Sequence, residues 1–161
     1  MGAELRHPHC RWETAQPRGS RDGRRNALLA ELKERLHDSD FYRWAGIDLV
    51  EASPGRVEVA FEAGPQHVNL QGLVHGGMLA TLADTAMGLA VRTVLEPGRR
   101  HVTVQLGVEF LSAGKAGLIV AEGRTLKIGR QLGFAEADVK DAGGRLLARA
   151  HATLSVTTPR S

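Results

Sequence analysis

Apolar and polar residues recur with two different periods along this chain, one helical and one strand-like. Leucines at helical spacing predict a helix over residues 27–43. The run 78–91 is rich in Ala, Leu and Met and carries a single charged residue, Asp84. Such a run predicts a second helix, which is buried because it lacks a polar face and which ends near Leu95, ahead of Pro97.

Strand-like alternation appears on both sides of the predicted buried helix. After the helix, the odd positions of 102–110, Thr103 among them, face away from the apolar row at the even positions. Strands joined by short turns pair antiparallel, so one antiparallel sheet covering one apolar helix is expected, which makes the fold class α+β. The predicted strands are 48–52, 56–63, 102–110, 118–128, 132–140 and 146–156, with a kink or bulge at 129–131.

Composition and charge divide the chain into a tail and a body. The 161 residues suit one domain, predicted over 27–157, with 158–161 as a short C-terminal tail. Residues 1–26 are Arg- and Pro-containing with few apolar side chains, so they predict a disordered basic tail. The first 25 residues contain six Arg and three acidic residues, whereas the rest contains 15 basic and 15 acidic residues. A neutral body with 4% aromatic residues argues against nucleic-acid binding.

Targeting and metal signals are weak. The single cysteine, Cys10, excludes an intrachain disulfide, and its neighbours His7 and His9 are more typical of an incidental grouping than of a metal site. No secretory segment or membrane span is recognisable, so a cytoplasmic protein is expected. No histidine, cysteine and carboxylate spacing indicates zinc, and no cofactor is predicted.

The start of the buried helix carries the candidate chemistry. Gly76 and Gly77 would leave backbone N–H groups free at a helix N-terminus, where a developing oxyanion can bind. Asp84 lies within about 20° of the direction of Gly77 on a helix, beside small residues such as Thr81. Asn69 and His75 flank the turn.

This constellation fits hydrolysis of an activated acyl group, with the carboxylate as general base or nucleophile. Serine and cysteine hydrolases are disfavoured because the chain lacks a Gly-x-Ser-x-Gly motif and a suitably placed cysteine. Structural interpretations stay open: Asp84 as a satisfied core carboxylate, His75 as a helix cap, Asn69 as a turn former and Thr103 as an ordinary strand residue.

The chain resembles the hotdog-fold acyl-CoA thioesterases, in their PaaI-type (phenylacetic acid degradation) branch. The residues that carry this resemblance are Asn69, Gly72, His75-Gly76-Gly77 and Leu82-Ala83-Asp84. The resemblance extends over residues 40–157. It implies a long central helix wrapped by an antiparallel sheet, here with an extra N-terminal helix. It also implies a homodimer whose sheets join edge to edge, commonly paired into a tetramer, with the active site at the dimer interface.

The resemblance also implies roles for individual residues. Asp84 would be the base or nucleophile, the Gly76 N–H would polarise the thioester carbonyl, and Gly77 would shape the turn. Asn69 and His75 would position water, thioester or thiol, and Thr103 stands where the family often has a residue reaching in from the partner subunit. Thr81, Lys127 and Arg130 are candidate substrate contacts, the last two for the CoA phosphates.

The expected activity is hydrolysis of an aryl-, arylacetyl- or medium-chain acyl-CoA to the free acid and CoA. One alternative is a non-catalytic acyl-CoA-binding protein, which the presence of both Asn69 and Asp84 argues against. A second is an enoyl-CoA hydratase or dehydratase, whose usual motifs do not occur in this sequence.

Overall fold

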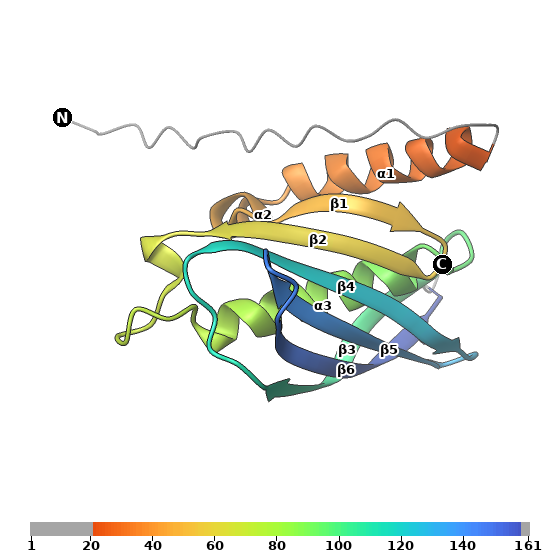
Figure 1. The fold of residues 1–161 in the computed structure, drawn as a ribbon. Helices are drawn as coiled ribbons and strands as arrows, with labels where there is room; N and C mark the ends of the chain where they lie inside the picture. Colours follow the sequence, from red (N-terminus) through yellow and green to blue (C-terminus); the bar gives the residue numbers. More distant parts are fainter. Residues whose placement is uncertain (1–20, 159–161) are drawn as a thin grey trace.

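A computed structural model describes residues 21–158, and its six strands form one antiparallel sheet wrapped around a long helix (Figure 1). The order of strands in the sheet is β1-β2-β4-β5-β6-β3. This is the α+β hotdog architecture that the sequence predicts. The elements are α1 (Arg21–His37), α2 (Asp40–Ala45), β1 (Asp48–Ser53), β2 (Arg56–Ala63), a short 3-10 helix (Pro65–His67), α3 (Gly76–Arg92), β3 (Arg100–Phe110), β4 (Gly117–Ile128), β5 (Leu132–Asp141) and β6 (Leu146–Thr157).

The long helix α3 lies against the concave face of the sheet, as its apolar sequence predicts. Leu82, Ala86 and Ala90 are fully buried, and α3 contacts every strand from β2 to β6. Its closest approach is to β4, where a Cβ on Gly123 would lie 2.3 Å from the carbonyl carbon of Ala86. One strip of α3, which includes Thr81 and Asp84, is only half-buried, so the sheet does not cover the whole helix.

The N-terminal helix differs from its prediction in both boundaries. It begins at Arg21, inside the stretch assigned to the tail, and ends at His37. A second short helix, α2, follows it. Residues 1–20 and 159–161, with Cys10 and most of the predicted tail, lie outside the described residues. No helix within the described range 21–158 has the length and apolar character needed to cross a membrane.

Strand β3 corrects two sequence-based predictions. It pairs with β6 and not with β4, although β3 and β4 are consecutive, so adjacency along the chain did not decide this pairing. The register also shifts between Thr103 and Gln105, where Val104 is the extra residue. A bulge reverses which side chains face inward, because side chains alternate strictly along a regular strand. Val102 and Leu106 therefore lie on opposite faces, not on the common face that alternation predicts.

Smaller differences occur at turns. The helix α3 ends at Arg92, one turn before the predicted Leu95. Residues 129–131 form the tight connection between β4 and β5, with Gly129 N–H donating to Leu132 O over 2.7 Å, while the nearby bulge lies between Thr125 and Lys127.

Candidate functional site

The first turn of α3 leaves one backbone N–H free for a ligand. His75 is the N-cap, and its Nδ1 accepts the N–H of Gly77 over 2.9 Å. The carbonyl of His75 accepts the N–H groups of Met78 and Leu79. None of the hydrogen bonds between described residues uses the N–H of Gly76. The sequence predicts two free donors at this helix start, and the structure has one, at Gly76.

Both glycines of this turn are required by their surroundings. A Cβ on Gly76 would lie 3.2 Å from the ring of Phe110, and a Cβ on Gly77 would lie 2.9 Å from Nδ1 of His75. His75 therefore caps the helix, as the structural interpretation holds. Because Nδ1 is an acceptor, its Nε2 carries the proton in the neutral ring and points a donor away from the cap.

Asn69 shapes the loop that leads to this turn. Its Oδ1 accepts the N–H groups of Gln71 and Leu73, over 2.9 and 3.2 Å. The loop is thus an Asn-stabilised turn, and the side-chain Nδ2 remains as a donor. Asn69 and Gly76 both line a cavity of 310 Å³. Its other lining residues are mainly apolar or small: Leu73, Val74, Leu79, Phe110, Leu111, Ser112, Ala113 and Gly114.

Asp84 lies in the middle of α3 and is bound by Thr103. The hydroxyl of Thr103 donates to Oδ1 of Asp84 over 2.9 Å, within one chain. The bulge at Val104 makes this contact possible, since Thr103 pairs with the buried Leu154 and so faces the helix. The second carboxylate oxygen has no hydrogen-bond partner among the described residues, which leaves it free to accept a proton from water.

The two halves of the predicted site are separated along the helix axis. Gly76 and Asp84 are eight residues apart on α3, which corresponds to about 12 Å at 1.5 Å per residue. An acyl carbonyl hydrogen-bonded to the Gly76 N–H lies within about 3 Å of that donor. The carboxylate of the same chain therefore does not reach its carbon. Gly77 and Asp84 point to the same side of the helix, but they are too far apart along its axis to act on the same substrate atom.

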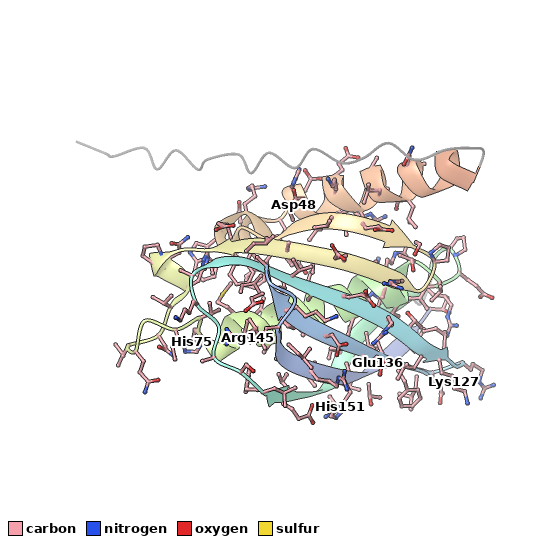
Figure 2. The ribbon with its side chains drawn as sticks, viewed as in Figure 1. Asp48, His75, Lys127, Glu136, Arg145 and His151 are labelled. Carbon is pink, nitrogen blue, oxygen red and sulfur yellow. The ribbon has the colours of Figure 1, made fainter. Side chains whose placement is uncertain are left out.

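The predicted phosphate contacts form a third group. Lys127, near the end of β4, lies at the opposite end of the molecule from His75 (Figure 2). Lys127 and Arg130 are exposed, and the carbonyl of Arg130 accepts a hydrogen bond from the guanidinium of Arg99.

Thr81 is half-buried on the same side of α3 as Asp84, and its carbonyl accepts the hydroxyl of Thr85.

One residue near Asp84 was missed by sequence reasoning. His101 precedes Thr103 by two positions and lies beside Gly88, whose Cβ would be 3.4 Å from its ring. Burial and the charge of Arg92 lower the pKa of His101, whereas the charge of Asp84 raises it. Its spacing from Thr103 on one strand face is the signal that could have identified it.

No cluster of three or more His, Cys, Asp or Glu side chains in the part of the chain that the structure describes could hold a metal ion. The grouping of His7, His9 and Cys10 lies outside that part.

Comparison with known proteins identifies the family. The model of the thioesterase superfamily matches residues 71–148, a range that includes His75, Gly76, Asp84 and Thr103. Human acyl-coenzyme A thioesterase 13 is 35% identical over 130 residues, which cover 79% of this chain and 92% of that protein.

Solved structures agree with this assignment. The zebrafish thioesterase superfamily member 2 is 30% identical, with a TM-score of 0.72 and coverage of 79% of this chain and 96% of the other. The Escherichia coli PaaI protein of the phenylacetic acid degradation operon has a TM-score of 0.74 at 22% identity, over 81% and 94% of the two chains, and thus shares the fold. The chain therefore belongs to the thioesterase superfamily, and it is a thioester hydrolase of hotdog fold.

Proposed function

We propose that the protein hydrolyses acyl-CoA thioesters to the free acid and CoA, with Asp84 as general base or nucleophile. The observation that carries this proposal is the half-buried carboxylate of Asp84, fixed through one oxygen by Thr103 and open at the other. A fixed carboxylate with a free oxygen can activate water or attack a carbonyl directly. The relative named acyl-coenzyme A thioesterase 13 supports acyl-CoA as the substrate class.

The Gly76 N–H is the proposed oxyanion donor. A backbone N–H at a helix N-terminus stabilises negative charge as it develops, and Phe110 and His75 fix the turn that presents it. Asn69 Nδ2 and His75 Nε2 are the proposed donors to the thioester or the departing thiol. Thr81 borders the proposed substrate path beside Asp84.

We further propose that the reaction takes place between two copies of the chain. The separation of about 12 Å along α3 supports this, because one copy would supply Gly76 and Asn69 while the other supplies Asp84 and Thr103. Among the residues that the structure describes, edge strand β3 pairs with β6 alone, and it carries exposed apolar side chains, among them Val102 at 66% and Val104 at 59%. An unpaired edge with apolar residues favours pairing with a second copy about a twofold axis.

The cavity beside Gly76 is the proposed place of the acyl group. Leu79, Phe110 and Leu111 give it an apolar wall, and its volume of 310 Å³ suits an aryl or medium-length acyl chain. Phe110 and Leu111 are each 56% exposed in the single chain, so a second copy would complete the wall.

The test is release of free thiol from a panel of aryl-, arylacetyl- and straight-chain acyl-CoA substrates. We expect turnover with at least one class, measured with a thiol reagent. Saturable binding of acyl-CoA without thiol release would instead indicate a binding protein. Hydration of an enoyl-CoA, measured as the loss of its ultraviolet absorbance, would indicate a hydratase.

A further inference from the structure

Arginines from three parts of the chain surround a cavity near the C-terminal end of α3. The cavity has a volume of 470 Å³. Arg35 belongs to α1, Arg92 to the last turn of α3, and Arg100 to the start of β3. The described residues that line it are Arg35, Arg92, Gly98, Arg99, Arg100 and His101, and none of these is acidic.

Neutral groups, and not carboxylates, hold the arginines closest to α3. Arg92 Nη1 donates to the carbonyl of Arg99 over 3.1 Å, and Arg99 Nη2 donates to the carbonyl of Arg130. Arg100 has neither an ion pair nor a hydrogen bond from its side chain to another described residue. A carbonyl positions a guanidinium without neutralising its charge, so this cluster keeps a positive charge that an anion can use.

Arg35 is the member with a carboxylate partner. It pairs with Glu31 over 3.1 Å, but both side chains are more than half exposed, so this pair is weak. Arg35 can therefore turn toward a bound anion at little cost.

Arginines on the remaining described surface are arranged differently. Five of them form ion pairs: Arg43 with Asp40, Arg56 with Glu122, Arg124 with Glu136, Arg145 with Asp141 and Arg149 with Asp138. The exception is Arg130, which makes no ion pair with another described residue and whose carbonyl accepts the guanidinium of Arg99 from the cluster. Residues 26–161 also contain equal numbers of basic and acidic residues. The uncompensated charge around the cavity is thus a local feature and not a consequence of a basic protein.

The helix dipole explains one member of the cluster only. Arg92 in the last turn of α3 is favoured by the partial negative charge of that terminus. Arg35, Arg99 and Arg100 are not on this helix, and bringing their like charges together is unfavourable without an anion between them. The lowered pKa of His101, caused by burial and by Arg92, is consistent with a positive potential at the cavity.

We propose that this arginine cavity binds the phosphate groups of the CoA part of the substrate, an inference that rests on the proposed thioesterase function. Guanidinium groups match phosphate geometry through paired hydrogen bonds. CoA carries its phosphates at the far end of a long pantetheine arm from its sulfur. Arg92 lies eight residues, or about 12 Å, beyond Asp84 on α3, and His101 leads from the cavity to Thr103. The cavity is therefore displaced from the carboxylate in the way this arm requires.

The direct test is binding of adenosine 3′,5′-bisphosphate, the phosphate-bearing end of CoA without its sulfur, measured by titration calorimetry. We expect saturable binding that weakens with added salt. Arg100→Gln should weaken it about tenfold, as expected for loss of one charged hydrogen-bond donor. The double variant Arg35→Gln/Arg100→Gln should weaken it further. Lys140→Gln, on the exposed side of β5, is the matched control and should bind as the wild type does.

Kinetic measurements distinguish binding of the nucleotide phosphates of CoA from binding of a carboxylate on the acyl group. The same variants should raise KM for an acyl-CoA and leave turnover of the matching acyl-pantetheine, which lacks the nucleotide phosphates, unchanged. Unaltered bisphosphate binding and KM in the double variant would overturn the proposal. So would variants that lose only the hydrolysis of acyl groups ending in a carboxylate. If the protein binds the bisphosphate but hydrolyses no acyl-CoA, the proposed thioesterase function is overturned, while the phosphate-binding role of the arginine cavity is supported.

Discussion

At the scale of single residues, the Asp84–Thr103 hydrogen bond gives the most direct prediction. Asp84→Asn keeps the volume and an oxygen that can accept the Thr103 hydroxyl, but it removes the base or nucleophile. We expect kcat to fall by about 10²–10⁴-fold, measured by thiol release, with an unchanged unfolding midpoint. Thr103→Ser, which keeps the hydroxyl, should retain most activity, whereas Thr103→Val should lose a substantial part of it. Near-normal turnover of Asp84→Asn would remove Asp84 from its proposed role.

His67 gives a prediction on stability. It is 2% exposed, its Nδ1 accepts the N–H of Gly64 over 3.0 Å, and burial lowers its pKa from the usual 6.5. Well above pH 6.5 the ring is neutral in both states. As the pH falls below that value, the unfolded chain takes up a proton that the folded chain resists, so the free energy of unfolding decreases.

Urea unfolding at pH 7.5 and at pH 5.5 measures this effect. His67→Gln should reduce the decrease between the two pH values. His101, whose pKa is also lowered, acts in the same direction, so some decrease should remain in His67→Gln. A decrease that is equal in His67→Gln and wild type would contradict the assignment to His67.

At the scale of elements, the packing of α3 on β4 depends on a missing side chain. A Cβ on Gly123 would lie 2.3 Å from the carbonyl carbon and 2.4 Å from the carbonyl oxygen of Ala86, and 2.7 Å from the N of Met87. These are backbone atoms, so the helix itself must move. Gly123→Ala should lower the free energy of unfolding by about 1–3 kcal/mol, measured by urea denaturation. Gly143→Ala, in the β5–β6 turn, is the control and should change it little.

Sequence periodicity predicted the two long helices and the six strands, but not the separate short helix α2, the 3-10 helix at Pro65–His67 or how β3 is used. The alternation from Val102 to Phe110 is regular, so it predicts one apolar face. The bulge at Val104 is decided by pairing with β6, which is distant in the sequence and leaves no local signal. Only after this reversal does Thr103 face Asp84, and only then do Leu106 and Phe110 face the helix. Local pattern thus located the carboxylate, while long-range pairing supplied its partner.

At the scale of the whole molecule, the motif residues were predicted as one site, and the fold separates them. Asn69, His75 and Gly76 gather at the start of α3, Asp84 and Thr103 lie about 12 Å further along it, and the arginine cavity lies beyond them. The helical period gives direction around an axis but also fixes distance along it. Both the direction around the axis and the distance along it can be read from the sequence. How a second copy brings its own residues across that distance depends on contacts between chains, which periodicity does not encode.

Complementation between two inactive variants tests the two-copy site. Asp84→Asn removes the base, and Asn69→Asp keeps the oxygen that accepts from Gln71 and Leu73 while removing the Nδ2 donor. Each variant alone should be nearly inactive. If one copy supplies Asn69 and the other Asp84, a mixed dimer has one intact site and one doubly altered site. Random reassociation of equal amounts should then restore about a quarter of wild-type turnover, since half of the dimers are mixed. Sites formed within single chains predict instead no activity above that of the separate variants, because every chain in the mixture carries one defect.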